Sequence, residues 1–557
     1  MYVLGVNGWN SGTHDASACL FRDGQMIAAA EEERFSRQKK AFNALPYHAI
    51  GYCLHEADIS ASVIDQVAVG WDIGKLTGSE VTAQQVLNTI LPKHLFPRKR
   101  EPECRMYAHH AAHAAGAYFS SGFDQAAILV IDGSGEDISA TIAKGDDGTI
   151  RMMDTMRIHQ SIGIFYEAAS IYLGFGRFNE GKTMGLSSYG DDVYSFPDIL
   201  AGPPGFTPGT LAPDELYSRT TAAWIAYMQK VTRLPLLQPK YAYSVLDAKL
   251  KAGSDVMPYR SLAASAQKAL ERAAVALVRQ AVERTGCRHV CISGGVGLNC
   301  VANGIVAGLE QVEELYIQPA ASDSGTSIGA ATLLLSEHGI RPHIDRTHVY
   351  SGPEYSSDAI ERLLRHNNIN YEVLGDNSAD RISELLLQNK VVARFHGKME
   401  FGPRALGNRS IIANPQQRDM LVRVNRIKHR EQWRPLAPSL IEEAAGQVLK
   451  NAVGGSPYMI LNAYITDEYR SQIPAVVHVD GSARAQVVDK AFNPEYWRLI
   501  RAFWEKSGVP AVINTSFNIG NEPIVCSPGH AIRSFFGSEL DALLLENILL
   551  VKQVNIG

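Results

Sequence analysis

The stretch CRMYAHHAAHAAGAYFSSGFDQAAILVIDGSGED, residues 104–137, decides how the rest of the chain is interpreted. Its first half is rich in alanine, and a helix there places His109 and His113 at positions i and i+4, on one face. Its second half contains the apolar run AAILVI, which has the length of a strand and ends at Asp132 in a Gly-Ser-Gly turn. The stretch predicts a divalent metal held by nitrogen and oxygen beside a glycine loop that can accept phosphate. The alternative is that the histidines are ordinary helix residues and that the aspartate caps a turn.

The bulk properties of the chain set limits on its class. A chain of 557 residues is too long for one hydrophobic core, so we expect two or more domains. A formal net charge of -5 gives no general attraction for nucleic acid. The 7 cysteines are an odd number in apolar contexts, which favours core thiols over disulfides or zinc sites. No basic N-terminal segment and no apolar run of about 18 residues is present, so we predict a cytoplasmic protein without a membrane span.

A histidine near the N-terminus is a candidate general base. Residues 2–7, YVLGVN, are predicted to form a buried strand, which a glycine-bearing turn joins to His14 and Asp15. An imidazole has an ordinary pKa of about 6.5, so it can take up a proton near neutral pH. A purely structural histidine is the alternative. Two further strands, joined by a short hairpin at Asp23 and Gly24, are predicted to follow.

Two later segments repeat the order of strand, glycine loop and helix. The first runs through RHVCISGGVGLNCVANG at 288–304, and the second through LYIQPAASDSGTSIGAA at 315–331. Such loops present backbone amides to a nucleotide phosphate, although a tight packing turn would look the same. Asp323 in the second loop can complete the ligand set begun at residues 109–132. Two aspartates on separate strand-end loops predict two βα lobes that face each other across a cleft, as in the actin and sugar-kinase superfamily.

A further glycine-rich stretch, GFGRFNEGKTMGLSSYG at 174–190, is predicted to be a loop that contacts an anion. Its spacing does not match a Walker loop.

The second half of the chain carries a local excess of positive charge. Polar composition around residues 338–353 predicts a domain boundary there. Residues 394–434 hold ten Lys or Arg and three Asp or Glu. Some of these cations fit a solvated helix face. The following fit phosphate binding better, because guanidinium groups grip phosphate in bidentate fashion: Arg404, Arg409, Lys428, Arg430 and Arg434.

Together these motifs resemble the NodU/CmcH family of O-carbamoyltransferases, collinearly over essentially the whole chain. The resemblance rests on GVNGWNSGTHDASA, HHAAH, IDGSGE, EGKTMGLSSYG, SGGVGLNCVAN, GKMEFGPRALGNRSI, IKHREQWRPLAP and NTSFNIGNEPIV. It implies an α/β fold with an actin-like, TsaD-like two-lobed domain at 1–350 and a YrdC-like α+β domain at 351–557. It also implies that the C-terminal domain makes carbamoyl adenylate from carbamoyl phosphate and ATP. The N-terminal domain then passes the carbamoyl group to a hydroxyl of the acceptor, and AMP leaves.

The resemblance also assigns roles to individual residues. It implies that the metal, Fe²⁺ or another divalent ion, is bound by His109, His113, Asp132 and Asp323, and that His14 is the base on the acceptor hydroxyl. It places the adenylate at Gly133, Gly135, Gly295 and Asn299. It places carbamoyl phosphate and ATP, with Mg²⁺, at Arg404, Lys428, Arg434 and Ser516. The sequence departs from the family pattern where NTSFNIGNEPIV has Ile-Gly-Asn and where SSYG replaces APYG.

The expected partners are therefore carbamoyl phosphate, ATP and a small hydroxylated acceptor, with neither nucleic acid nor membrane. We expect the acceptor to be a natural product in antibiotic biosynthesis, namely an aminoglycoside, a sugar or a glycosylated macrolide. Insertions at 72–103 and 191–260 are where its pocket could form. Trp224, Tyr227 and Tyr241 are candidates for stacking on a ring, with core packing as the alternative.

Two other functions compete with this one. An actin-fold small-molecule kinase explains the glycine loops but leaves the basic cluster unused. An RNA-binding relative of the tRNA threonylcarbamoylation proteins would need a more basic surface. A hydrogenase-maturation carbamoyltransferase is disfavoured, because the chain has neither CxxC pairs nor an acylphosphatase-like segment.

Overall fold

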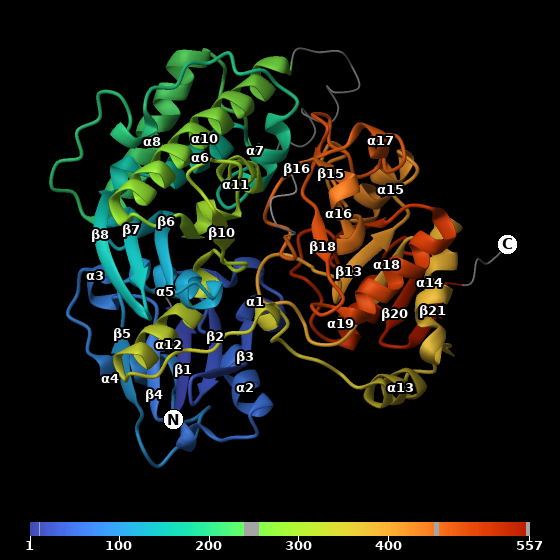
Figure 1. Ribbon diagram of the computed structural model, residues 1–557. Helices are drawn as coiled ribbons and strands as arrows, with labels where there is room; N and C mark the ends of the chain where they lie inside the picture. The colour runs from blue at the N-terminus through green and yellow to red at the C-terminus, as the bar shows by residue number, and fades with distance from the viewer. Residues whose placement is uncertain (10–11, 239–255, 451–455, 553–557) are drawn as a thin grey trace. The chain divides into compact units, whose positions relative to one another are not determined.

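The computed structural model describes residues 1–9, 12–238, 256–450 and 456–552 (Figure 1). The chain divides into two compact units. The first comprises Met1–Glu32 and Lys40–Asp345, and the second comprises Glu33–Lys39 and Arg346–Gly557. The main division therefore lies at 345/346, whereas the sequence placed it at 350/351. The assignment of Glu33–Lys39 to the second unit was not predicted.

The first unit contains two five-stranded sheets of the same topology. In each sheet three strands form an antiparallel meander, and two later strands add in parallel beside the first strand of the meander. The orders are β3-β2-β1-β4-β5 and β10-β9-β6-β7-β8. The strands of the first sheet are β1 Tyr2–Asn7, β2 Ser17–Arg22, β3 Gln25–Glu31, β4 Gln66–Val69 and β5 Glu103–Met106. Those of the second are β6 Gln125–Gly135, β7 Ile138–Asp146, β8 Thr149–Arg157, β9 His289–Ser293 and β10 Glu314–Ile317. The repeated topology confirms the two-lobed α/β prediction, although the sequence showed no repeat.

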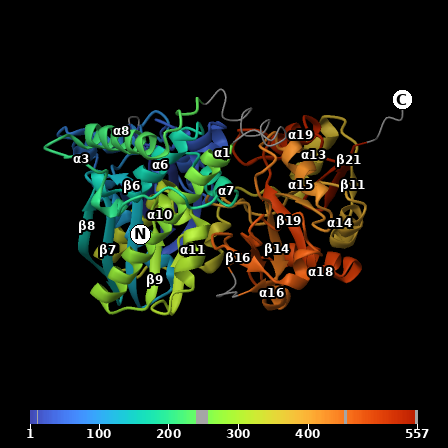
Figure 2. The ribbon, with the colours of Figure 1, turned by 90° about the horizontal axis from the view of Figure 1, so that it is seen from above.

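Helices separate and cover the two sheets. Helix α12 (Thr326–Glu337) packs on β1, β2 and β4, α5 (His109–Ser121) packs on β6, β9 and β10, and the two helices contact each other. In Figure 1 both helices lie between the two sheets. Helix α2 (Tyr47–Glu56) covers the outer side of the first sheet, and α6 (Ile162–Tyr172) and α10 (Met257–Thr285) contact β6 of the second. Helix α8 (Pro213–Thr232) lies against α6, as Figures 1 and 2 show.

Most predicted elements of this unit are confirmed, and one is wrong. The hairpin at Asp23 and Gly24, the helix that carries both histidines, and the strands before each glycine loop are present. Gly286 ends α10 in the left-handed conformation, with a φ of 71°. Residues 174–190 are not a single loop, because Glu180–Ser187 form helix α7, which packs against α10. Helix α11 (Cys300–Ala307) follows the glycine loop at 294–298, as predicted.

The second unit is built on a mixed eight-stranded sheet in the order β11-β21-β20-β12-β13-β19-β14-β18. Its central strands are β12 Val392–Phe395, β13 Arg409–Ala413, β19 Ala511–Ser516, β20 Ala542–Leu545 and β14 Ala437–Ile441. Its outer strands are β11 Glu372–Val373, β21 Ile548–Val551 and β18 Gln486–Val488. Its longer helices are α13 Ser357–His366, α14 Ser378–Leu387, α15 Asp419–Ile427, α18 Pro494–Ser507 and α19 Pro528–Phe536. One continuous apolar core holds this sheet and its helices together, which agrees with the predicted α+β unit.

Residues 33–39 bond to two loops of the second unit. The Arg34 guanidinium donates to the carbonyl of Gly402 at 2.7 Å. Arg37 donates to the carbonyls of Pro523 and Ile524, both at 2.6 Å. Phe35 packs against an apolar cluster of Met399, Ala405, Ile524 and Cys526. The segment thus fixes the loop before β13 and the loop after β19.

The sequence predicted that no helix spans a membrane and that the cysteines are core thiols. Among the described residues, no helix is both long and apolar enough to cross a membrane. All seven cysteines are free, and all but Cys104 are buried, as expected for core thiols.

Candidate functional site

Four buried side chains meet where the carboxyl ends of the parallel strands of both lobes face each other. His109 and His113 come from the start of α5, Asp132 from β6, and Asp323 from the turn before α12. One ligand atom of each lies within 4.8 Å of all the others. The structure therefore brings together all four residues predicted to bind the metal.

The spacing of these atoms fits a single ion. The two histidine Nε2 atoms are 3.1 Å apart. His109 Nε2 lies 3.6 Å from Asp132 Oδ2 and 3.5 Å from Asp323 Oδ1, and His113 Nε2 lies 3.8 Å from Asp323 Oδ1. Ligands that bind one ion tetrahedrally at about 2.1 Å are about 3.4 Å from one another. Only small movements would place all four around one ion.

Neighbouring groups orient both imidazoles. His109 Nδ1 is 3.0 Å from the carbonyl of Gly70, which can only accept, so Nδ1 carries hydrogen and Nε2 is the ligand atom. His113 Nδ1 is 3.0 Å from the Ser293 hydroxyl, at the end of β9. The Trp71 ring stacks on His109 with centroids 3.6 Å apart. Two nitrogen lone pairs that face each other in this way require a proton or a cation between them.

The electrostatics of the four groups favour an added positive charge. Burial lowers the pKa of His109, but the carboxylates of Asp323 and Asp132 outweigh it and raise that pKa to about 10. Burial and the charge on His109 lower the pKa of His113. Burial tends to raise the pKa of Asp132, yet its hydrogen bond with His109 holds it at about 2. Two carboxylates thus share the site with one protonated imidazole, which leaves a negative charge for a cation to balance.

Two glycines bring the ligand-bearing helices together. Helices α5 and α12 cross at Gly116 and Gly329, and a Cβ on Gly329 would lie 1.7 Å from the carbonyl oxygen of Ala112. No larger residue fits at this crossing. The small residues keep Asp323, just before α12, within reach of the two histidines on α5.

The remaining residues of the HHAAH and DGSGE motifs support the ligands. His110 turns away, and its Nδ1 lies 2.9 Å from the Thr141 hydroxyl. A Cβ on Gly135 would lie 2.6 Å from His110 and 2.8 Å from His109, so this glycine makes room for the two rings. Glu136 accepts from the His109 backbone N–H at 3.0 Å and so caps the start of α5.

His14 lies beside the metal ligands. Its Nδ1 is 3.8 Å from Asp323 Oδ2 and 3.1 Å from Asp15 Oδ2. Lys40 bonds the same Asp15 oxygen at 2.9 Å. Burial would lower the pKa of His14, but Asp323 and Asp15 raise it above 6.5. Asp15 fixes the Nδ1–H tautomer and leaves Nε2 to take a proton. Sequence reasoning missed this role for Asp15, although the residue adjoins the histidine in the chain.

Two of the four residues predicted to hold the adenylate, Gly133 and Gly295, adjoin Asp132. Gly295 N–H donates to Asp132 Oδ1 at 2.8 Å, so the glycine loop reaches the metal ligands. Gly133 lies in the same turn as Asp132, and a Cβ there would approach only Tyr217, at 4.0 Å. The Asn299 side chain caps α11 and exchanges hydrogen bonds with Gln267 at 3.0 and 3.1 Å. Adenylate contact with these residues stays a prediction.

In the second unit, cations gather around the end of β19. Buried Lys428 donates to the Ser516 carbonyl and to Asn518 Oδ1, the latter at 2.9 Å. Burial, together with Arg430 and Arg434, lowers the pKa of Lys428 well below its ordinary value. The pKa of Arg430 is also lowered, first by burial, then by the charge of Arg434, and then by the charge of Arg484. The structure thus brings Lys428, Ser516 and Arg434 together, and their binding of carbamoyl phosphate and ATP stays a prediction.

Of the cations in this group, Arg484 was missed, because it follows Lys428 by more than fifty residues and stands outside the basic stretch.

The FGPRALGNR loop is held in place by hydrogen bonds to other groups of the second unit. Arg404 lies partly exposed on it, and the carbonyl of Ala405 accepts from Asn514 of β19 at 3.2 Å. Arg409 is wholly buried, stacks 3.6 Å from the Phe395 ring centre, and donates to backbone carbonyls such as that of Pro353 at 2.9 Å. Glu400 accepts from three backbone N–H groups of the loop. Arg409 therefore supports the loop. The sequence pattern placed it among the phosphate-binding cations, but its guanidinium is buried and donates to backbone carbonyls.

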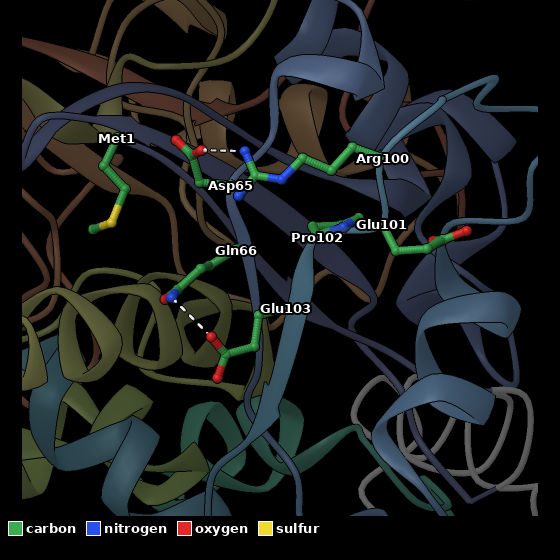
Figure 3. A pocket seen from close by; sticks show the side chains of 7 residues that line it. All are labelled: Met1, Asp65, Gln66, Arg100, Glu101, Pro102 and Glu103. Atoms are coloured by element: carbon green, nitrogen blue, oxygen red, sulfur yellow. Dashed lines mark hydrogen bonds and ion pairs between the residues drawn. The ribbon is translucent and has the colours of Figure 1, made fainter.

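Other candidate surfaces lie apart from this chemistry. A cavity of about 490 Å³ is lined by Met1, Asp65, Gln66, Arg100, Glu101, Pro102 and Glu103 (Figure 3). It opens at the amino ends of β1, β4 and β5, opposite the metal ligands, and its side chains bond to one another, as in Gln66 to Glu103 at 3.2 Å. Trp224 is buried and packs edge-on against Phe165, so its role is in the core. Tyr241 lies outside the described residues.

Known proteins resemble this chain over most of its length. The family model described as Carbamoyltransferase N-terminus matches residues 72–332, and Carbamoyltransferase C-terminus matches 383–552. Nodulation protein NolNO of Sinorhizobium fredii is 34% identical, over 98% of this chain and 80% of that protein. Nodulation protein U of Bradyrhizobium diazoefficiens is 27% identical, over 91% of each.

Solved structures are more distant. HypF of T. kodakarensis shares 13% identity and a TM-score of 0.32, over 61% of this chain and 48% of that one. ROK hexokinase of Thermus thermophilus shares 15% identity and a TM-score of 0.28, over 60% of this chain and 98% of that one. The family matches cover both units, so the chain belongs to the NodU/CmcH-type O-carbamoyltransferase family and is a carbamoyltransferase.

Proposed function

We propose that this carbamoyltransferase is ATP-dependent and works in two steps, one in each unit. In the first step, carbamoyl phosphate, ATP and water give carbamoyl adenylate, pyrophosphate and phosphate. In the second step, a hydroxyl oxygen of the acceptor attacks the carbamoyl carbon, the bond from that carbon to the AMP oxygen breaks, and AMP leaves. The observation that carries the proposal is the placement of a base, His14, against a complete metal-ligand set in the first unit.

The second unit supplies the residues for the first step. Lys428, Arg430, Arg434 and Arg484 form a concentration of positive charge with few acids, which suits the phosphates of ATP and carbamoyl phosphate. The Ser516 hydroxyl lies 3.4 Å from Lys428 Nζ and can bond the same phosphate. Arg404 would contribute from its partly exposed position, and Mg²⁺ would accompany ATP.

The first unit supplies the residues for the second step. His14 Nε2 takes the hydroxyl proton, while Asp15 stabilises the imidazolium that results. Gly133 and the Gly295 loop offer backbone amides to the AMP phosphate, and Gly135 and Asn299 complete that side of the site. His109, His113, Asp132 and Asp323 would hold a divalent ion, Fe²⁺ in our proposal, although this ligand set also suits zinc or manganese. Such an ion neutralises phosphate charge and so makes AMP a better leaving group.

The acceptor we propose is a hydroxylated natural product, an aminoglycoside, a sugar or a glycosylated macrolide, in antibiotic biosynthesis in the cytoplasm. The test is incubation of the full chain with carbamoyl phosphate, ATP and a panel of hydroxylated antibiotics. We expect AMP, pyrophosphate and phosphate in equal amounts, and an acceptor that gains one carbamoyl group by mass spectrometry. Formation of ADP alone would rule out the adenylate and would favour a kinase.

A further inference from the structure

Three aromatic rings meet around the proposed base. The His14 ring lies edge-on to Phe178, with centroids 4.7 Å apart, and to Phe42, with centroids 6.1 Å apart. Phe42 and Phe178 in turn lie 4.9 Å apart. Phe42 comes from the segment before α2, and Phe178 from the loop before α7. The two phenylalanines therefore flank the side chain that must receive the acceptor's proton.

These rings are not placed as core residues are. Phe42 keeps 38% of its surface exposed, and 27% of the His14 side chain is exposed. Phe178 has a φ of 61°, in the left-handed region that bulky residues avoid. A residue held there in spite of its backbone preference points to a use for its side chain. Burial in the core therefore does not explain why Phe178, with its strained backbone, lies against the exposed ring of Phe42.

The charges next to the rings are already balanced. Lys40 and Arg177 lie 5.8 and 5.2 Å from the Phe178 ring centre. Lys40 pairs with Asp15 at 2.9 Å, and Arg177 pairs with Glu167 at 3.1 Å. The second oxygen of Glu167 accepts from Tyr217 at 2.8 Å, and Arg177 stacks over the Tyr217 ring at 5.0 Å. Both of these carboxylates are engaged. A third carboxylate, that of Glu180, accepts from the Phe178 backbone N–H at 3.0 Å, and burial raises its pKa, which disfavours its charged form.

We propose that Phe42 and Phe178 form the acceptor seat beside His14, and that this seat takes an uncharged pyranose ring. The inference rests on the proposed function and narrows its acceptor. An aromatic platform contacts the apolar C–H face of a sugar, and the polar groups at its rim bond the hydroxyls. The ammonium groups of a polycationic aminoglycoside would have to compete with Lys40 and Arg177 for the carboxylates that these two cations already pair with. The seat thus presents one ring hydroxyl to His14 Nε2 and selects against acceptors with several amines.

Ring binding is measured without the reaction, by saturation-transfer NMR with p-nitrophenyl β-D-glucopyranoside on the full chain. We expect saturation of the pyranose protons in the wild type. The dissociation constant should rise about tenfold in Phe178→Ala and in Phe42→Ala, the range expected for losing an aromatic contact. Phe178→Tyr should restore binding, because it keeps the ring. Phe123→Ala is the matched control, since Phe123 is partly buried in the same unit but stacks on His289, away from the seat.

Two further measurements separate this inference from the proposed function. ATP–pyrophosphate exchange that depends on carbamoyl phosphate needs no acceptor, so its absence from the wild type contradicts the proposed function alone. Kanamycin, as a polycationic probe, should not displace the glucoside. Equal glucoside binding by the wild type and both alanine variants, or displacement by kanamycin, would overturn the seat.

Discussion

Replacing Gly329 by alanine tests whether the crossing of α5 and α12 sets the geometry of the metal ligands. The added Cβ would lie 1.7 Å from the Ala112 carbonyl oxygen and 2.9 Å from the Gly116 nitrogen. Close carbon to oxygen contacts in proteins are about 3.3 Å, so the helices must separate by roughly 1.6 Å. Metal sites tolerate deviations of about 0.2 Å in ligand distance. Asp323 would therefore lose its place opposite the two histidines of α5.

We expect two effects of Gly329→Ala. Overpacking should lower the free energy of unfolding of the first unit by about 1–3 kcal/mol. Displacement of the ligands should weaken metal binding by about 10–100-fold, as losses of supporting contacts do. Urea denaturation measures the first effect, and calorimetric titration with Zn²⁺ or Mn²⁺ measures the second.

A matched substitution separates these effects from those of alanine itself. Gly51 lies inside α2 of the same unit, and a Cβ there would meet nothing within 4 Å. Gly51→Ala should keep wild-type metal affinity and gain up to about 1 kcal/mol in stability from helix propensity. If folded Gly329→Ala binds metal as tightly as the wild type, the crossing does not control the site, and the reasoning is refuted.

Three other predictions address the ligands, the basic cluster and the FGPRALGNR loop. His113→Ala should reduce the metal content of the purified chain far below one ion per chain, whereas His110→Ala should retain the ion, as elemental analysis of the folded fraction would show. Lys428 should take up a proton when phosphate binds at alkaline pH, because burial lowers the pKa of the free lysine and a bound anion raises it again. Phosphate affinity should therefore fall as the pH rises toward 10.5. Calorimetry in buffers of different ionisation enthalpy detects this uptake, and its persistence in Lys428→Met would assign it elsewhere. Glu400→Gln should cost about 1–3 kcal/mol of unfolding free energy, since Glu400 accepts three buried N–H bonds, while Glu372→Gln on exposed strand β11 should cost nothing measurable.

The local sequence pattern was enough to predict which residues of the helices, strands and turns supply the metal ligands. The i and i+4 spacing placed His109 and His113 on one face, and the apolar run before Asp132 placed that carboxylate at a strand end. Asp323 could be added because the same order of elements returns there. These predictions depend on short-range geometry, which the chain specifies within a few residues.

The groups that orient the ligands could not be predicted in this way. The Gly70 carbonyl is 39 residues from His109, and the Ser293 hydroxyl is 180 residues from His113. Only the sheet register brings them together, because β4 ends at Val69, just before Gly70, and β9 ends at Ser293. Neither residue type in isolation signals that it will bond an imidazole.

Two elements departed from their local pattern for tertiary reasons. Residues 180–187 form a helix despite their glycines, since α7 gains packing against α10. Residues 543–551, LLLENILLV, are almost entirely apolar and have the length of one strand, yet they belong to the hairpin of β20 and β21, which turns at Glu546 with a φ of 52°. The Glu546 carboxylate bonds Gly397 N–H at 2.7 Å and His396 at 2.9 Å, and these contacts from another strand hold a turn that lacks glycine.

The excursion of residues 33–39 into the second unit changes how the two halves are connected. The polypeptide passes from one unit to the other after Glu32, after Lys39 and after Asp345, so three covalent connections join the units. A protease that cuts once near residue 345 therefore leaves the halves still attached through the N-terminal excursion. A separately expressed C-terminal half would lack Arg34 and Arg37. Two of its loops would therefore lose the hydrogen bonds that these arginines donate to them.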